Sequence, residues 1–213
     1  MKSEFYNCDN MEFMAKFPDG HFELAIVDPP YGIGADKSQN AGDKKWGFKQ
    51  YKQTDWDSSI PNKEYFAELK RVSKNQIIWG GNYMTEHLAP SMGWIVWDKE
   101  QRDFSLADGE LAWTSFKKAL RIFELSRGKA LANNNEDGGR IHPTQKPVRL
   151  YEWLLANYAK EGDKILDTHV GSGSSRIACH NLKFDFFGCE LDEDYFKQAE
   201  QRYQEHIRQE TLF

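Results

Sequence analysis

The stretch KILDTHVGSGSS, residues 164–175, is typical of a strand that runs into a glycine-containing loop and then into a helix. An apolar strand at 164–167 comes first, and Gly171 and Gly173 lie in the loop that follows it. Glycine lets a ligand approach the backbone closely, and the free amides at a helix start attract polar groups. We therefore expect a ligand-binding turn at the carboxyl end of a buried strand.

Outside this stretch, apolar patterns of strand type alternate with patterns of helix type. We expect strands at 22–27, 76–79, 94–97, 111–116, 164–167 and 184–190. We expect helices at 62–74, 148–158, 174–182 and 192–208. Strands separated by helices predict an α/β fold with a parallel sheet and helices on both faces. Residues 125–141 show no periodicity, and we expect a mobile loop there.

Composition places the chain among cytoplasmic globular proteins. Its 213 residues fit one domain spanning 1–213, and 39% hydrophobic and 14% aromatic residues supply a core. No apolar run reaches the roughly 20 residues of a membrane span, and the first residues lack the pattern of a secretory signal. The three cysteines form no C-x-x-C pair, and the six histidines show no H-E-x-x-H spacing. We therefore expect no metal site.

The net charge of −5 hides a basic middle segment between acidic ends. Residues 34–56 hold five lysines against three acids, and residues 117–149 hold eight basic residues against three acids. Lysines neutralise phosphates, and interleaved aromatic rings stack on bases. We expect DNA-contacting insertions at about 34–60 and 98–140. The candidate DNA-binding residues are Lys37, Lys44, Lys45, Trp46, Lys49, Lys52, Arg121, Arg127, Lys129 and Arg140.

A second motif, Asp28-Pro29-Pro30-Tyr31, ends the predicted strand at 22–27. The exocyclic amine of a nucleobase is a poor nucleophile because its lone pair is delocalised into the ring. The Asp28 carboxylate and the Pro29 carbonyl can each accept one of its N–H groups, and the two prolines fix their relative placement. Tyr31 can stack on a base that has been rotated out of the duplex.

Two further features point to a nucleoside ligand at the glycine turn. Arg176 stands where a dinucleotide fingerprint needs a third glycine, which disfavours pyrophosphate and weakens an oxidoreductase reading. Glu190 ends the strand about twenty residues on, where an acid accepts hydrogen bonds from ribose hydroxyls. The third motif, HPTQKP at 142–147, opens a helix and on its own indicates only a helix start.

Together the three motifs resemble the β-class amino-group DNA methyltransferases, which use S-adenosyl-L-methionine. The resemblance spans residues 22–199 and implies a Rossmann-like fold with a mixed, mostly parallel seven-stranded sheet. It implies a catalytic loop of Asp28, Pro29, Pro30 and Tyr31. It also implies a cofactor site of Asp167, His169, Gly171, Ser172, Gly173, Ser174, Glu190, His142, Thr144, Gln145 and Lys146. The D-P-P-Y form is more like the adenine-N6 members, so we expect transfer of a methyl group to adenine N6 in double-stranded DNA.

The sequence also departs from the family pattern and leaves alternatives open. Relatives carry Asp-Pro-Phe where this chain has Asp167-Thr168-His169. A cytosine-N4 methyltransferase, a catalytically silent DNA-binding relative and an RNA substrate stay open, as does the presence of a paired restriction endonuclease. The resemblance also implies a homodimer by analogy. The last residues resemble the peptide by which bacterial proteins dock on the sliding clamp, through Gln209, Leu212 and Phe213.

Overall fold

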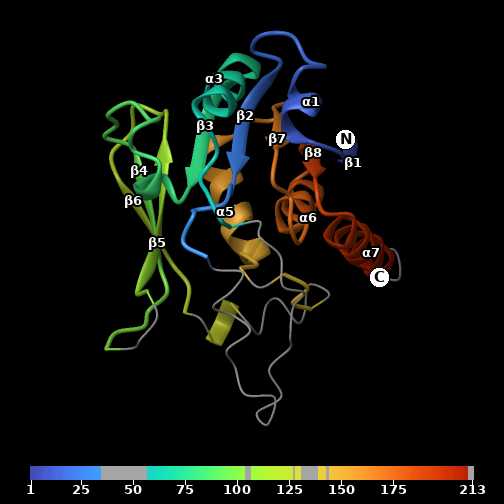
Figure 1. The fold of residues 1–213 in the computed structure, drawn as a ribbon. Helices are drawn as coiled ribbons and strands as arrows, with labels where there is room; N and C mark the ends of the chain where they lie inside the picture. Colours follow the sequence, from blue (N-terminus) through green and yellow to red (C-terminus); the bar gives the residue numbers. More distant parts are fainter. Residues whose placement is uncertain (35–56, 104–106, 127, 131–138, 143, 211–213) are drawn as a thin grey trace.

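The computed structural model describes residues 1–34, 57–103, 107–126, 128–130, 139–142 and 144–210, which form a sheet with helices on both faces (Figure 1). The sheet has eight strands in the order β1-β8-β7-β2-β3-β5-β4-β6. The strands are β1 (Ser3–Asn7), β2 (Phe22–Val27), β3 (Ser73–Trp79), β4 (Trp94–Asp98), β5 (Gly109–Thr114), β6 (Arg121–Glu124), β7 (Lys164–Asp167) and β8 (Asp185–Glu190). The helices are α1 (Asn10–Met14), α3 (Lys63–Val72), α5 (Val148–Tyr158), α6 (Ser174–Asn181) and α7 (Glu193–Glu210), with a 3₁₀ turn η3 (Gly81–Tyr83).

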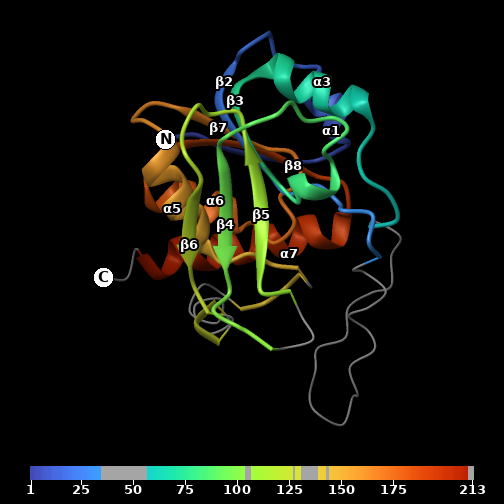
Figure 2. The same ribbon diagram turned by 90° about the vertical axis from the view of Figure 1, so that its left-hand side faces the viewer.

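The direction of the strands decides where a site can form. All strand pairs are parallel except those that β5 makes with β3 and β4. The carboxyl ends of β2, β3, β7 and β8 therefore meet at one edge of the sheet, which is where open α/β sheets bind ligands. Figure 2 shows β4, β5 and β6 side by side in front of the rest of the sheet, and they form the end of the sheet opposite β1.

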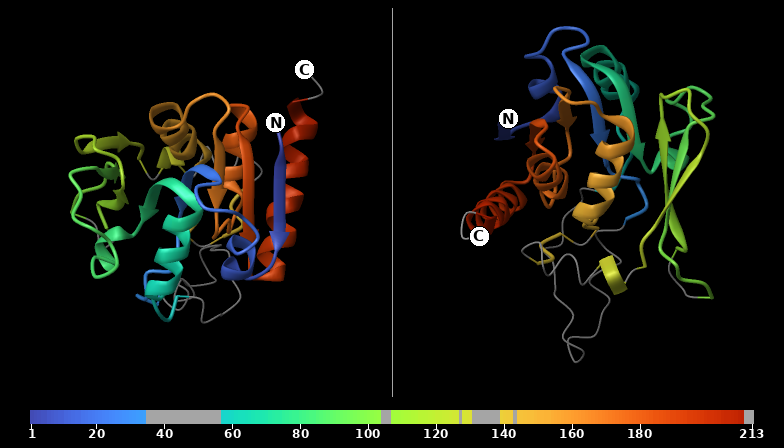
Figure 3. Two further views of the ribbon diagram at one scale, coloured as in Figure 1. Left: turned by 90° about the horizontal axis from the view of Figure 1, so that it is seen from above. Right: turned by 180° about the vertical axis from the view of Figure 1, so that it is seen from behind.

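Alternating side chains along the central strands pack into cores on both faces of the sheet. Along β2, Leu24 and Ile26 join a core cluster that contains the apolar faces of α5 and α6, whereas Ala25 and Val27 join a second cluster with α1 and α3. The view from above in Figure 3 shows α3 on one side of the sheet and α5 on the other. This layering explains the near-continuous apolar run at 22–27, because a parallel strand covered on both faces needs no polar side.

The helices begin where polar side chains satisfy their first amides. The Asn62 side chain accepts a hydrogen bond from the Tyr65 amide at 3.0 Å and caps α3, and Asp9 caps α1 through the amides of Met11 and Glu12. Helix α3 ends directly at Ser73, where the backbone turns extended and β3 starts. Among the described helices, none is both long enough and apolar enough to cross a membrane.

The structure corrects several predicted boundaries. The described residues form an eight-stranded sheet, whereas the resemblance implied seven strands and the pattern analysis assigned six; β1 and β6 are the two strands that the pattern analysis did not assign. The strand predicted at 111–116 covers Gly109–Thr114, and helix 62–74 ends at Val72. The segment 98–140 contains β5 and β6, and the predicted role of this segment as a DNA-contacting insertion stays a prediction. Residues 128–130 within the predicted loop at 125–141 form a helical turn.

The packing of β8 gives a prediction for stability. A Cβ added at Gly188 would lie 2.6 Å from Val170 Cγ2 and 2.7 Å from Phe186 Cζ. Gly188→Ala should therefore lower the free energy of unfolding by about 1–3 kcal/mol, measured by urea denaturation. Gly128→Ala is the control, because its added Cβ meets nothing within 4 Å. Equal stability of the two variants would contradict the packing described here.

Candidate active site

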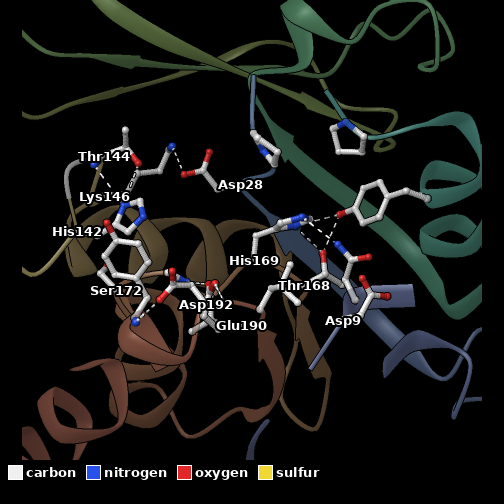
Figure 4. A pocket seen from close by; sticks show the side chains of 18 of the residues that line it. Asp9, Asp28, His142, Thr144, Lys146, Thr168, His169, Ser172, Glu190 and Asp192 are labelled. Carbon is white, nitrogen blue, oxygen red and sulfur yellow. Dashed lines mark hydrogen bonds and ion pairs between the residues drawn. The ribbon is translucent and has the colours of Figure 1, made fainter. Parts of the chain in front are cut away.

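A cavity of about 560 Å³ lies at the carboxyl edge of the sheet and joins all three sequence motifs. Its wall contains residues of the catalytic loop, the HPTQKP loop, the glycine turn and the end of β8. These residues include Asp28, Pro30, His142, Thr144, Gln145, Lys146, His169, Gly171, Ser172 and Glu190. Figure 4 shows Asp28 and Lys146 on one side of the pocket and Glu190 on another. The volume lies within the roughly 300–1,000 Å³ of small-molecule sites.

The glycine turn is held by the carboxylate that ends β7. Asp167 is buried, and it accepts hydrogen bonds from the His169 amide at 3.0 Å and the Ser175 hydroxyl at 2.6 Å. Burial raises the pKa of Asp167 to about 7. Gly171 and Gly173 have φ values of +54° and +78°, a backbone conformation that glycine adopts without strain. The Asp167 side chain therefore stabilises the glycine turn by hydrogen bonds to residues on both sides of it.

Glu190 reaches from the end of β8 into the cavity. Its Oε2 accepts a hydrogen bond from the Gly171 amide at 2.8 Å, and its Oε1 accepts one from the Asp192 amide at 3.0 Å. Burial raises the pKa of Glu190, and the two amides oppose that rise. Each carboxylate oxygen keeps acceptor capacity, so the group can still receive hydroxyl donors from a ligand.

The HPTQKP loop folds back on itself through side-chain hydrogen bonds. His142 Nδ1 lies 3.3 Å from the Thr144 amide and 3.1 Å from the Thr144 hydroxyl, and the imidazole ring packs against the Tyr195 ring at 4.4 Å. Burial, with the charges of Lys146 and Arg140, lowers the pKa of His142 to about 3. His142 is therefore neutral and its Nδ1 accepts. The Gln145 side chain accepts a hydrogen bond from the Ile141 amide at 2.9 Å.

His169 follows Asp167 and Thr168 at the start of the glycine turn, and its ring is part of a polar network. Its Nε2 lies 3.1 Å from Asn10 Nδ2 and its Nδ1 lies 3.0 Å from Thr168 Oγ1. The Tyr65 hydroxyl lies 2.7 Å from the same threonine oxygen. Burial lowers the pKa of His169 to about 4, so the ring is a neutral wall of the cavity. Sequence reasoning missed Asn10 and Tyr65, because their approach depends on the packing of α1 and α3.

The catalytic loop is fixed by two carboxylates. Asp57 is 1% exposed, and its Oδ1 accepts hydrogen bonds from the amides of Tyr31 at 2.6 Å and Gly32 at 2.9 Å. The Tyr31 hydroxyl donates to Asp28 Oδ1 at 2.6 Å. The Tyr31 ring stacks on Tyr83 with 5.2 Å between centroids and 18° between planes. The loop is thus held in one shape before any ligand binds.

Lys146 contacts the Asp28 carboxylate and also lines the large cavity. Its Nζ is 2.5 Å from Asp28 Oδ2, 3.1 Å from Glu110 Oε2 and 3.1 Å from the Tyr31 hydroxyl. The lysine side chain is only 3% exposed. Burial opposes its charge, but Asp28 and Glu110 outweigh that effect and raise the pKa of Lys146. Burial likewise raises the pKa of Asp28, and the Lys146 charge opposes the rise.

A second cavity of about 270 Å³ adjoins the first through Asp28, Thr144 and Lys146, which line both. Its other lining residues include Tyr31, Asn82, Tyr83, Lys99 and Glu110. The Asp28 carboxylate therefore stands between two hollows, one beside the glycine turn and one beside stacked tyrosine rings.

The predicted DNA-binding residues are only partly placed. Arg121 begins β6 and so lies at the amino end of the parallel strands, away from the site edge. Lys129 is exposed, and Arg140 is partly buried with its Nε 3.4 Å from the His142 carbonyl. Of the predicted residues, those outside the described part are Lys37, Lys44, Lys45, Trp46, Lys49, Lys52, Arg127, Leu212 and Phe213. Gln209 is exposed at the end of α7.

Two of the predicted cofactor-binding residues, Gly173 and Ser174, support the turn and are not among the residues that line the cavity. Gly173 directly precedes α6. The Ser174 hydroxyl lies 3.2 Å from the Ser172 hydroxyl and 3.0 Å from Arg202, so these contacts stabilise the turn where α6 begins.

Within the ranges the structure describes, no group of three or more histidine, cysteine or carboxylate side chains could hold a metal ion.

Comparisons with known proteins agree with this geometry. A family model described as DNA methylase matches residues 96–201. The chain is 27% identical over 235 residues to the Type II methyltransferase M2.DpnII of Streptococcus pneumoniae, covering 91% of this chain and 87% of that protein.

Solved structures of methyltransferases share the fold. The M1.HpyAVI–SAM complex matches with a TM-score of 0.59 and 22% identity, over 93% of this chain and 98% of that one. The cytosine-N4-specific PvuII DNA methyltransferase matches with a TM-score of 0.61 and 14% identity, over 98% of this chain and 91% of that one. The match to the family model includes the loop at 142–146 and Glu190 at the end of β8, and these residues line the same cavity as Asp28. The chain therefore belongs to the N6/N4 DNA methylase family.

Proposed function

We propose that this protein transfers the methyl group of S-adenosyl-L-methionine to the N6 amine of a flipped adenine in DNA. One observation carries the proposal: Asp28 stands between the cavity of the glycine turn and the cavity of the stacked tyrosines. A methyl donor in the first and an amine in the second would meet at this carboxylate. Direct displacement requires such an arrangement, since the acceptor must approach in line with the bond that breaks.

The larger cavity fits the proposed cofactor in its donor set. Glu190 offers carboxylate oxygens to ribose hydroxyls, and the Thr144 hydroxyl and Ser172 offer polar groups to an amino-acid moiety. Asn10, Tyr65 and His169 form one wall, which is suited to a purine ring. When bound, S-adenosylmethionine supplies an electrophilic methyl group on a sulfonium.

The catalytic loop prepares the amine. The Asp28 carboxylate accepts one N–H of the amine and the Pro29 carbonyl accepts the other, which localises the nitrogen lone pair. The two prolines keep these acceptors in fixed relation. Tyr31 supplies an aromatic surface beside the amine, and its own ring is supported by Tyr83 at 5.2 Å.

The choice of adenine rests on the aspartate at the first position of the D-P-P-Y motif, and a cytosine-N4 amine is the second candidate because the PvuII enzyme shares the fold. The test is mass spectrometry of nucleosides from unmethylated DNA incubated with the protein and S-adenosylmethionine. We expect N6-methyladenine. N4-methylcytosine would overturn the base assignment, and the absence of any methylated base would support the catalytically silent alternative.

We also propose that the protein acts in the cytoplasm, on double-stranded DNA, within a restriction-modification system. A homodimer and docking on a sliding clamp through Gln209, Leu212 and Phe213 belong to the same proposal. The clamp contact is supported by the pattern of the last residues alone, which lie mostly outside the described part.

Removing the catalytic carboxylate should separate chemistry from cofactor binding. Asp28→Ala should lower kcat by about a thousandfold, on the scale of losing one electrostatic contact in a transition state. Lys146 keeps Glu110 as a partner at 3.1 Å, so the buried ammonium is not left alone. Isothermal titration with S-adenosylmethionine should give a nearly unchanged Kd. A large rise in Kd with little change in kcat would refute the role given to Asp28.

Glu190 should control affinity for the cofactor. Glu190→Gln replaces one acceptor oxygen with an amide donor that faces the backbone amides of Gly171 and Asp192. We expect the Kd for S-adenosylmethionine to rise about tenfold, the worth of a charged hydrogen bond. Glu193→Gln is the control, because Glu193 is exposed and forms a surface ion pair with Lys197 at 2.6 Å. Equal Kd values for both variants would remove Glu190 from the cofactor site.

Gly80 should be required for the position of the Tyr31 ring. Its φ is +68°, and an added Cβ would lie 2.2 Å from Tyr31 Cε1. Gly80→Ala should therefore displace the ring and lower kcat about tenfold or more, with little effect on the Kd of the cofactor. Gly20→Ala is the matched control, since its φ is +61° but its nearest neighbour is a lysine side chain at 3.8 Å. Wild-type kcat in Gly80→Ala would contradict the assignment.

A further inference from the structure

The charged groups around Asp28 form a chain that continues away from the catalytic loop. Lys146 Nζ contacts Asp28 Oδ2 at 2.5 Å and Glu110 Oε2 at 3.1 Å. The other oxygen of Glu110, Oε1, lies 2.7 Å from Lys99 Nζ. Charges therefore alternate in sign from Lys99 through Glu110 and Lys146 to Asp28. Lys99 follows β4 and Glu110 lies on β5, so the chain links the wall of the smaller cavity to the end of β2.

The chain of charges raises a question for the proposed reaction, because both oxygens of Asp28 already have partners. In the free site, Asp28 Oδ2 is engaged by Lys146 and Oδ1 by the Tyr31 hydroxyl. An amine that binds Asp28 must share the carboxylate with a buried ammonium or displace it. An ammonium that leaves its partner in a buried site needs another anion close by, because an unpaired buried charge is very costly.

Glu110 supplies that second anion at a short distance. The Lys146 ammonium already contacts it, and the ring of Trp79 lies 5.3 Å from Nζ while the ring of Tyr31 lies 5.6 Å away. These rings confine the lysine head between the two carboxylates. The partners of Glu110 lower its pKa to about 2 against the opposing effect of burial, so it stays ionised.

We propose that Glu110 is a positioning residue that takes over Lys146 when the amine of the target base binds Asp28, with Lys99 holding Glu110 in place. This inference rests on the proposed function for the target base, whereas the charge coupling among Lys99, Glu110, Lys146 and Asp28 is a property of the protein alone. No covalent step is involved. The residue acts on the reaction only through Lys146 and the charge state of Asp28.

The proposal predicts shifts of opposite sign in two variants. The groups that face Asp28 are Lys146 from the HPTQKP loop, Tyr31 from its own loop, Glu110 from β5, Tyr151 from α5 and Asp167 from β7. Glu110→Gln removes a negative charge and leaves Lys146 to Asp28 alone, so Asp28 should titrate at lower pH. Lys99→Met removes the positive charge beside Glu110, so Glu110 attracts Lys146 more strongly. Asp28 then loses part of its stabilising partner and should titrate at higher pH.

The measurement is the carboxyl carbon signal of Asp28, followed by NMR against pH in the free protein. Glu110→Gln should move the midpoint to lower pH and Lys99→Met should move it to higher pH. Glu23→Gln is the matched control, because Glu23 also lies on a strand, pairs with a lysine at 2.9 Å and has a side chain 27% exposed against 24% for Glu110. That control should leave the midpoint unchanged, since Glu23 lies at the amino end of β2.

Enzyme activity, measured against pH, gives a second and independent test of the proposal. In Glu110→Gln, kcat should fall about tenfold because Lys146 stays on Asp28, while the acid limb of the kcat profile moves to lower pH with the Asp28 midpoint. A merely structural role would lower activity without moving that limb. Shifts of the same sign in both variants, or no shift in either, would overturn the inference. If the wild-type protein transfers no methyl group, that result contradicts the proposed function. The NMR titration then decides the role of Glu110 by itself.

Discussion

The ion pair between Asp28 and Lys146 is the contact on which the geometry of the site depends. It joins the end of β2 to the loop before α5, and these segments are 118 residues apart in the sequence. Two buried opposite charges at hydrogen-bond distance compensate each other only in good geometry. The supporting contacts from Tyr31 and Glu110 supply that geometry.

The parallel sheet makes this pair possible. Because β2, β3, β7 and β8 run in one direction, the loops that follow them converge, and residues from four distant segments meet in one cavity. The same arrangement places Glu190 beside the glycine turn, where its carboxylate accepts the Gly171 amide. The fold therefore forms two separate cavities. Residues that follow β7 and β8 line the larger one, residues of β5 and those that follow β3 line the smaller one, and Asp28 lies between them.

The sequence predicted those parts of the site whose chemistry is local. The D-P-P-Y loop, the turn at 171–173 and Glu190 each follow a strand with a clear apolar pattern, so their common edge follows from strand direction alone. Glu110 and Lys99 could not be found in this way, because the contacts of Glu110 with Lys146 and with Lys99 depend on the antiparallel pairing of β4 and β5. The strands β1 and β6 were missed because they are short outer strands with several partly or fully exposed residues. Lys146 was assigned to the cofactor loop, and its contact with Asp28 depends on tertiary packing.

The central claim is that Asp28 holds the target amine against the methyl donor. The most direct measurement is a crystal structure of the protein with unmethylated cognate DNA and S-adenosylhomocysteine, which lacks the transferable methyl group. The account predicts the adenine outside the duplex, with its amine within hydrogen-bond distance of Asp28 and the cofactor sulfur beside the glycine turn. An amine bound away from Asp28, or a cofactor outside the cavity of Glu190, would contradict it.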